Sequence, residues 1–122
     1  MGTEQFGPYI SKRAGADLRD KQYYAVVLDT DGEIQVATSG VGIGILVDNP
    51  NEGEYGTIQV AEGAKWVAAG AINPGTYVTS DANGRAIPAS AGDERLAFLK
   101  EAAVASGHVV SVQIVHAGQA NA

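Results

Sequence analysis

The chain has 122 residues, of which 45% are apolar and 18% charged, and a formal net charge of −6. This length predicts one domain with a buried core. The absence of cysteine excludes disulfides, thiolate metal sites and cysteine nucleophiles. No apolar run approaches the ~20 residues that cross a bilayer, and the N-terminus lacks the charged start and apolar core of a signal peptide. We therefore expect a protein made and used without secretion, with no membrane partner.

Charge is distributed unevenly along the chain. Residues 1–21 contain four of the eight basic residues and have a net charge of +1, whereas residues 22–122 have a net charge of −7. An acidic body repels phosphate backbones, so nucleic acid is not an expected partner. The asymmetry fits either the ordinary tail of an acidic domain or a weakly basic arm that docks on an acidic surface.

The first 21 residues show no hydrophobic periodicity and are interrupted by glycine and proline. Three apolar residues, Phe6, Tyr9 and Ile10, are nevertheless set in this stretch. Disordered tails are poorer in such residues. Residues 1–21 are therefore expected to form an irregular arm, which either frays or orders against a partner.

From residue 22 onward the pattern is that of a β protein. β-branched, aromatic and alternating runs, separated by Gly, Pro, Asn and Asp, predict a series of short strands. They lie at residues 23–28, 33–37, 41–47, 56–61, 65–69, 76–80, 85–89, 97–102 and 108–115. A short helix within residues 92–105, which are rich in alanine, is the main alternative to a strand there.

A spacing of 52 residues relates two parts of this body. Residues 26–32 (VVLDTDG) return as residues 78–84 (VTSDANG), and residues 24–60 share six identities with residues 76–112 when aligned without a gap. The shared positions are turn residues and strand faces, which indicates two similar β units joined by a Gly/Pro turn. The predicted fold is all-β, a small compact barrel or sandwich over residues 22–117, followed by a short tail at 118–122.

The repeated turn could also be interpreted as a calcium loop, because residues 29–33 alternate carboxylates around a glycine. However, an EF-hand needs a glutamate at its twelfth position, where this chain has Gly40. The second copy, Asp81-Ala82-Asn83-Gly84, loses a carboxylate but keeps the turn-forming residues. This favours a hairpin turn over a metal site.

No catalytic set emerges from the remaining motifs. The sequence contains no nucleophile elbow, phosphate loop or dinucleotide fingerprint. His108 and His116 flank one predicted strand and would lie about 25 Å apart, too far to share a metal. The expectation is a protein that is not an enzyme and has no catalytic residue, cofactor or metal. Trp66 is either a core residue or, together with the nearby Lys65, an exposed contact.

Two segments carry a resemblance to a known family. Residues 44–53 (GILVDNPNEG) and residues 69–86 (AGAINPGTYVTSDANGRA) resemble segments of the capsid decoration, or cement, proteins of tailed bacteriophages. The resemblance extends over about residues 22–115 and rests on turn and strand motifs. Thr76 stands where members of the family often have aspartate after the glycine.

The resemblance implies a non-enzymatic β domain, on the exterior of the virion, that binds the assembled head and bridges neighbouring subunits of the major capsid protein. It also implies a homotrimer and an arm that reaches onto the capsid. The arm residues expected to contact the capsid are Phe6, Pro8, Tyr9, Ile10, Lys12 and Arg13, and the candidate interface residues are Trp66 and Tyr77. Protein lacking residues 1–20 is then expected to stay folded but to lose capsid binding.

Two other functions are weighed against this one. The first is a carbohydrate- or surface-binding β module of a fibre or adhesin, which exposed aromatic side chains around Trp66 and Tyr77 would favour. The second, a small hydrolase or isomerase, has the least support, because no acid, base and nucleophile can be assembled from the sequence.

Overall fold

The computed structural model describes residues 9–116, in which every regular element is a β-strand. No helix in this range could span a membrane. The all-β prediction is confirmed, whereas the helix considered within residues 92–105 is replaced by turns and one short strand. The strands are β1 (Tyr9–Arg13), β2 (Ala25–Leu28), β3 (Ile34–Val36), β4 (Gly44–Leu46), β5 (Tyr55–Gln59), β6 (Glu62–Val67), β7 (Tyr77–Ser80), β8 (Ala86–Pro88), β9 (Ala97–Leu99) and β10 (Val109–Ile114).

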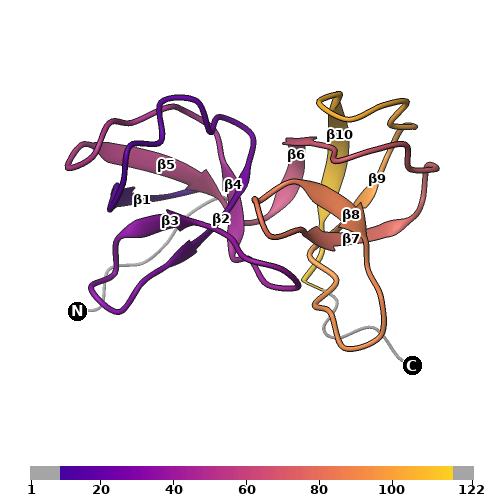
Figure 1. The fold of residues 1–122 in the computed structure, drawn as a ribbon, viewed down its shortest axis with the longest axis horizontal. Helices are drawn as coiled ribbons and strands as arrows, with labels where there is room; N and C mark the ends of the chain where they lie inside the picture. Colours follow the sequence, from indigo (N-terminus) through magenta and orange to yellow (C-terminus); the bar gives the residue numbers. More distant parts are fainter. Residues whose placement is uncertain (1–8, 117–122) are drawn as a thin grey trace.

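The ten strands form two five-stranded antiparallel sheets that lie side by side (Figure 1). The strand order is β1-β5-β4-β2-β3 in one sheet and β6-β10-β9-β7-β8 in the other. Adding five to each label of the first order gives the second, so the two sheets have the same topology. We call residues 9–61 the first half and residues 62–116 the second half.

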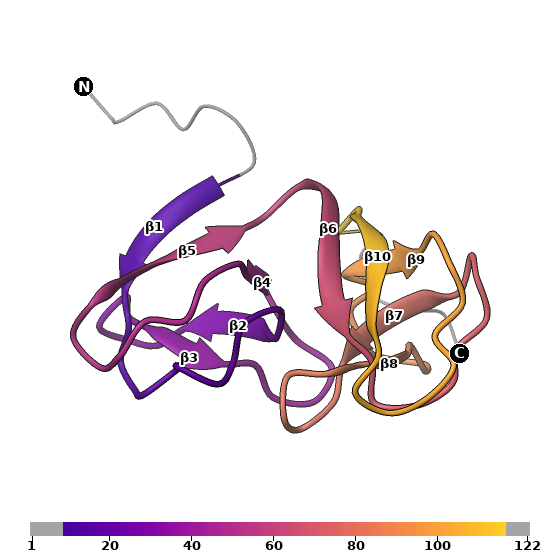
Figure 2. The same cartoon turned by 90° about the horizontal axis from the view of Figure 1, so that it is seen from above.

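Each half is a strongly curved sheet rather than a closed barrel (Figure 2). In the first half, Ala14 follows β1 directly and makes a single parallel bridge to Ile34 on β3, at the opposite edge of the sheet. Ala68 and Ala86 make the same bridge in the second half. Among the described residues no continuous ladder closes either sheet, so the fold is a sandwich-like pair and not a barrel.

The repeated Asp-x-Asx-Gly motif forms a β-hairpin turn in both halves, as predicted. Asp29 Oδ1 accepts hydrogen bonds from the backbone N–H groups of Asp31 and Glu33, at 2.9 and 3.0 Å. Asp81 Oδ1 accepts the equivalent pair from Asn83 and Arg85, at 2.8 and 2.9 Å. The glycine that follows has φ of +75° in the first turn and +82° in the second. Such angles favour glycine, which explains why this residue recurs.

The repeat is real, but its spacing is not constant. In the hairpin the spacing is 52 residues, since Gly32 corresponds to Gly84. At β4 it is 53, because Ile45 corresponds to Phe98: Ile45 pairs with Ala25, and Phe98 pairs with Tyr77. It becomes 54 at β1 and β5. The alignment without a gap was therefore wrong in its later part, because the β8–β9 and β9–β10 connections are each one residue longer than the β3–β4 and β4–β5 connections.

The ten residues with positive φ between residues 9 and 116 form five pairs of equivalent positions; four pairs join the two halves, and the fifth consists of the residues that follow β5 and β10. Four of the five pairs contain at least one glycine, and left-handed backbone is easiest for glycine. The conformation is retained even where glycine is absent, so the backbone path was duplicated as a whole. The pairs are Tyr23 with Gly75, Gly32 with Gly84, Gly40 with Gly92, Gly53 with Gly107, and Glu62 with His116.

Each half has a small apolar core of corresponding residues. In the first half these are Ala14, Leu18, Val26, Ile34, Leu46 and Ile58. In the second half they are Ala68, Ile72, Val78, Ala86, Leu99 and Val112. All twelve side chains are at most 5% exposed. The alternation of β-strand side chains explains the selection, since Val26 faces its own core whereas Ala25 faces the other half.

The two halves meet at an interface that we call the joint. The first half contributes a face made of Ala25, Ala37 and Ile45, all completely buried in the core cluster of the second half. Trp66, also 0% exposed, donates its Nε1–H to the carbonyl oxygen of Gly84 at 2.9 Å. The same oxygen accepts the backbone N–H of Ala25 at 2.7 Å, so the turn of the second hairpin is fixed on the first half.

The described part of the N-terminal segment differs from the irregular arm that the sequence predicts. Residues 9–13 form β1, which pairs with β5 over its whole length. Ala14 and Leu18 are each 1% exposed and belong to the first core. Residues 15–21 have no strand structure. The repeat visible in the sequence begins at residue 24, whereas β1 corresponds to β6 and completes the first unit.

Candidate interaction surface

The arm residues expected to contact a partner lie on β1, at the edge of the first sheet, as far as they fall within the described residues. Tyr9 is 47% exposed, Lys12 and Arg13 are also exposed, and Ile10 is half-buried against the first core. Because side chains alternate along a strand, Tyr9 and Arg13 share one face, and Ile10 and Lys12 share the other. Phe6 and Pro8 lie outside the described residues.

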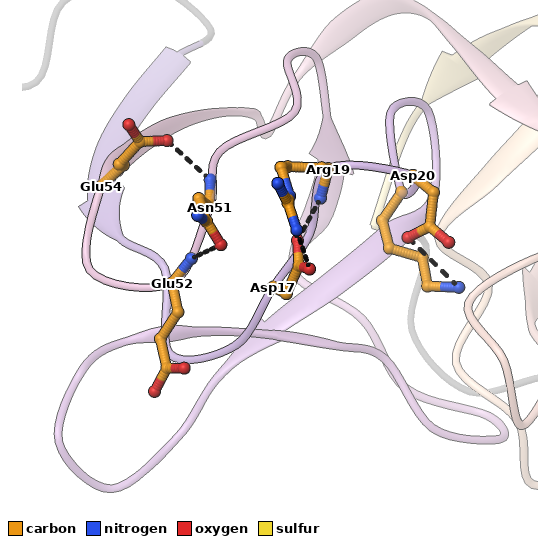
Figure 3. Close-up of polar contacts among 7 residues, drawn as sticks. Asp17, Arg19, Asp20, Asn51, Glu52 and Glu54 are labelled. Atoms are coloured by element: carbon orange, nitrogen blue, oxygen red, sulfur yellow. Dashed lines mark hydrogen bonds and ion pairs between the residues drawn. The ribbon is translucent and has the colours of Figure 1, made fainter.

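The loop that follows β1 is tied by backbone hydrogen bonds to the loop between β4 and β5; Figure 3 shows polar side chains of both loops. Leu18 donates its backbone N–H to the carbonyl of Pro50 at 3.0 Å, and Ala14 donates to that of Glu54 at 2.8 Å. Glu54 in turn accepts the backbone N–H of Asn51 at 2.7 Å. The buried Leu18 side chain therefore holds a charged loop in one place on the surface, beside β1.

Asp17 and Arg19 form the best-defined ion pair of this loop (Figure 3). The Nε and Nη2 groups of Arg19 donate to the two carboxylate oxygens at 2.9 and 2.8 Å, and its backbone N–H donates to Oδ1 at 3.1 Å. These hydrogen bonds, with the side-chain bonds contributing most, lower the pKa of Asp17 from 3.8 to about 2. Bidentate pairing has this effect because it stabilises the charged carboxylate.

This ion pair predicts a pH dependence. The pKa of Asp17 is lower in the folded protein than in the unfolded chain, so its stabilising effect is complete above pH ~4 and is lost as the pH falls through about 2. A carboxyl-detected NMR titration should therefore give Asp17 a pKa well below the usual range. Arg19→Gln should raise it towards 3.8, whereas Arg13→Gln should leave it unchanged. A normal pKa for Asp17 in the unmodified protein would contradict this contact.

The two candidate interface residues occupy opposite environments. Trp66 is completely buried in the joint, so its assignment to an external contact was wrong and the core alternative is correct. Tyr77 is 44% exposed and lies at the start of β7. Its ring packs edge-on against Phe98 at a centroid distance of 6.0 Å, and the Arg95 guanidinium lies 5.4 Å from its centroid.

The acidic turn and the histidines are engaged in backbone contacts. Asp29, Asp31 and Glu33 bring carboxylate oxygens within 4.8 Å of one another, but Asp29 uses Oδ1 for the turn and accepts Gln35 Nε2 on Oδ2 at 3.1 Å. His108 and His116 follow the prediction by flanking β10. His108 Nδ1 accepts the Val104 N–H at 3.2 Å, and His116 Nε2 lies 2.8 Å from the carbonyl oxygen of Val60.

The hollows among the described residues are small or open. One of about 100 Å³ lies where Gly42 of the first half meets the second half, next to Arg95 and His116. A shallow groove of about 400 Å³ follows the seam between the halves, where Tyr23, Lys65 and Lys100 line it. The first is smaller than a ligand pocket of roughly 300–1,000 Å³, and the second is open to solvent. The edge of β1 and the charged loop beside it are better suited to binding a macromolecular surface.

Comparison with known proteins relates the fold, but not the sequence, to a phage protein. No family model matches the chain, and no curated protein matches it. A crystal structure of the N base of head fiber gp8.5 in bacteriophage phi29 superposes with a TM-score of 0.70. The superposition covers 93% of this chain and 98% of that chain, at 18% sequence identity. At this identity the similarity establishes a shared fold.

Proposed function

We propose that this chain is a non-enzymatic structural protein of a phage head, which binds the outer surface of the assembled shell and bridges neighbouring capsid subunits. The observation that supports the proposal most is the fold shared with a head fiber base over nearly the full length of both chains. The sequence resemblance to capsid decoration proteins is independent of that comparison. The proposal places the protein on the exterior of the virion, with the major capsid protein as its partner.

The shell-binding surface in this proposal is the outward face of β1 together with the loop after it. Tyr9 and Arg13 share that face, and Arg19 and Lys21 are the basic residues of the loop. These residues lie in the segment that holds four of the eight basic residues of an otherwise acidic chain. Tyrosine and arginine are the residue types that contribute most to binding at protein interfaces. Phe6 and Pro8, expected to act with them, remain part of the proposal.

Weak individual contacts are sufficient for this function. A shell displays many copies of the same site, and a protein that contacts two subunits at once gains from the high effective concentration of its second contact. The ion pairs on this surface are exposed; for example, Arg13 Nε lies 3.5 Å from Glu33 with its side chain 59% exposed. Such pairs contribute little to folding stability and are available for exchange with an acidic partner surface.

A second candidate function is the base module of a head fibre, which would attach a further shaft to the head. The observation that favours it is the identity of the similar structure, an N base of a head fiber, of which 98% is covered. Both candidates require the same attachment to a shell. They differ in copy number and in whether anything extends from the bound domain.

The test is binding to assembled phage heads made of major capsid protein without this chain. We expect the unmodified protein to co-sediment with these heads and Tyr9→Ala/Arg13→Glu to lose at least about tenfold in affinity. Val104→Ala/Lys100→Glu, which makes the same kinds of change on exposed residues of the second half, is the matched control. Equal binding by both double variants would overturn the surface assignment, and no binding by the unmodified protein would overturn the function. Copies per head and cryo-electron microscopy then separate the two candidates.

A further inference from the structure

The joint between the two halves is asymmetric. The first half contributes the face Ala25–Ala37–Ile45, and the second half covers it with a different set of residues. We call that set the ridge, made of Trp66, Gly84 and Leu96. Gly84 lies so close that a Cβ there would be 2.7 Å from Val36, and Leu96 Cδ2 would lie 3.2 Å from a Cβ on Gly42. A contact between a face and a ridge is heterologous, because the two sides are unlike.

Duplication gives the second half a face of its own. Tyr77 pairs with Phe98 as Ala25 pairs with Ile45, and the N–H of Ala89 donates to the Tyr77 carbonyl at 3.0 Å, just as Ala37 donates to Ala25 at 2.9 Å. The second face is therefore Tyr77–Ala89–Phe98. Its counterpart is completely buried, yet Tyr77 is 44% exposed, and Ala89 and Phe98 are only partly buried.

The first half likewise carries a ridge of its own. Its members are Lys12, Gly32 and Ile43, which correspond to Trp66, Gly84 and Leu96. Lys12 is exposed, and a Cβ on Gly32 would meet nothing within 4 Å, in contrast to the crowded Gly84. Thus the joint uses the face of the first half and the ridge of the second half. The ridge of the first half and the face of the second half remain uncovered.

The uncovered face and ridge are complementary in size. In the joint the small Ala25 lies beside the large Trp66, and both donate to the same carbonyl oxygen. In the uncovered pair the sizes are exchanged, since the face has the large Tyr77 and the ridge has the slender Lys12. A lysine ammonium can lie over a tyrosine ring, as Lys21 does over Tyr24 at 5.0 Å in this protein.

The two uncovered surfaces are also complementary in charge. Gly32 stands in the acidic turn of Asp29, Asp31 and Glu33, which brings three carboxylates together. The uncovered face has Arg95 over the ring of Tyr77. Docking by the geometry of the joint would bring the acidic turn of one molecule to the aromatic and basic face of another. Such pairing favours the correct partner and disfavours contact between two like surfaces.

We propose that the Tyr77–Ala89–Phe98 face binds the Lys12–Gly32–Ile43 ridge of a second copy of this chain, head to tail, in the arrangement already present in the joint. A head-to-tail contact leaves a face at one end of the pair and a ridge at the other. It therefore continues into a closed ring or an open chain. The contact concerns the purified protein alone and does not depend on the proposed attachment to a phage head.

The first test is the mass of the purified protein as a function of concentration, by analytical ultracentrifugation. We expect species larger than a dimer, and a loss of about tenfold or more in association for Tyr77→Asp and for Lys12→Glu. The matched controls are Tyr55→Asp, at a tyrosine that is 71% exposed but outside the contact, and Lys100→Glu. Thermal unfolding verifies that all four variants remain folded. A protein that stays monomeric up to ~1 mM, or controls as defective as the test variants, would overturn the proposal.

The second test mixes the two defective variants. Tyr77→Asp retains an intact ridge and Lys12→Glu retains an intact face, so one good contact can form between them and none can follow it. The mixture should therefore form a one-to-one dimer and stop there, although each variant alone is monomeric. If the mixture stays monomeric, or assembles beyond a dimer, the head-to-tail contact is refuted.

Discussion

Protein that lacks residues 1–20 is expected to lose its cooperative fold. The deletion removes β1, which pairs with β5 from Tyr9 to Arg13, and two of the six residues of the first core, Ala14 and Leu18. Loss of Leu18 alone corresponds to about 2–5 kcal/mol, a large fraction of the roughly 5–15 kcal/mol that stabilises a domain. The expectation from the sequence, that this truncated protein stays folded, does not fit these contacts.

The measurement is thermal and urea unfolding followed by circular dichroism. Leu18→Ala should unfold cooperatively but at a clearly lower urea concentration, by about 2 kcal/mol or more. A shorter deletion of residues 1–8 keeps β1 and both buried residues, and serves as the control. A truncated protein without residues 1–20 that melts within a few degrees of the full chain would show that β1 and Leu18 contribute little. This result matters for function, because a shell-binding defect of the longer deletion would otherwise be attributed to lost contacts.

Gly84→Ala is expected to destabilise the protein much more than Gly32→Ala. Both glycines have a positive φ, +82° and +75°, so alanine costs about 1–2 kcal/mol at either position. At Gly84 the new Cβ would also lie 2.7 Å from Val36 Cγ1 and 2.9 Å from the carbonyl oxygen of Ala25. Because one of these neighbours is backbone, the halves must separate slightly, which adds about 1–3 kcal/mol.

The two substitutions form a matched pair, since they make the same change at equivalent turns. Urea unfolding gives the difference in free energy, and fluorescence of Trp66, the only tryptophan, reports on the joint. Gly84→Ala should shift the emission of the folded protein, whereas Gly32→Ala should not. Equal destabilisation by both would mean that the second turn is not held against the first half.

The sequence was sufficient to predict the hairpins and most strands. An Asp-x-Asx-Gly motif closes a turn through its own side chain, β2 is a short apolar run before such a turn, and β10 alternates apolar and polar residues. Such signals are local, so they can be seen without knowing the partner strand. The duplication was visible for the same reason, because turn glycines at left-handed positions are hard to replace.

The elements that were missed depend on contacts far away in the sequence. β1 has almost no buried residue of its own and is a strand because β5 pairs with it. Leu18 lies in an irregular stretch, and its burial follows from the Pro50 loop. The repeat could not predict the burial of Trp66, because the equivalent residue of the first half is Lys12, which is exposed. No local pattern contains this information.

The candidate surface was predicted in part. Lys12 and Arg13 were singled out from charge and lie on an exposed strand, but the strand separates them onto opposite faces. The sequence alone treated them as one cluster. Arg19 gained a role only from the structure, which ties the loop after β1 to the loop around Asn51 and Glu54 through backbone hydrogen bonds.

The asymmetry of the joint also orders events during synthesis of the chain. The core of the first half is complete within residues 14–58, so this half can begin to pack as soon as it leaves the ribosome. Its Ala25–Ala37–Ile45 face remains exposed to solvent until Trp66 and the Gly84 turn have been synthesised. The nascent protein therefore passes through a stage with one packed half and an uncovered apolar patch. That patch is fully covered only when translation has passed the second hairpin and reached Leu96.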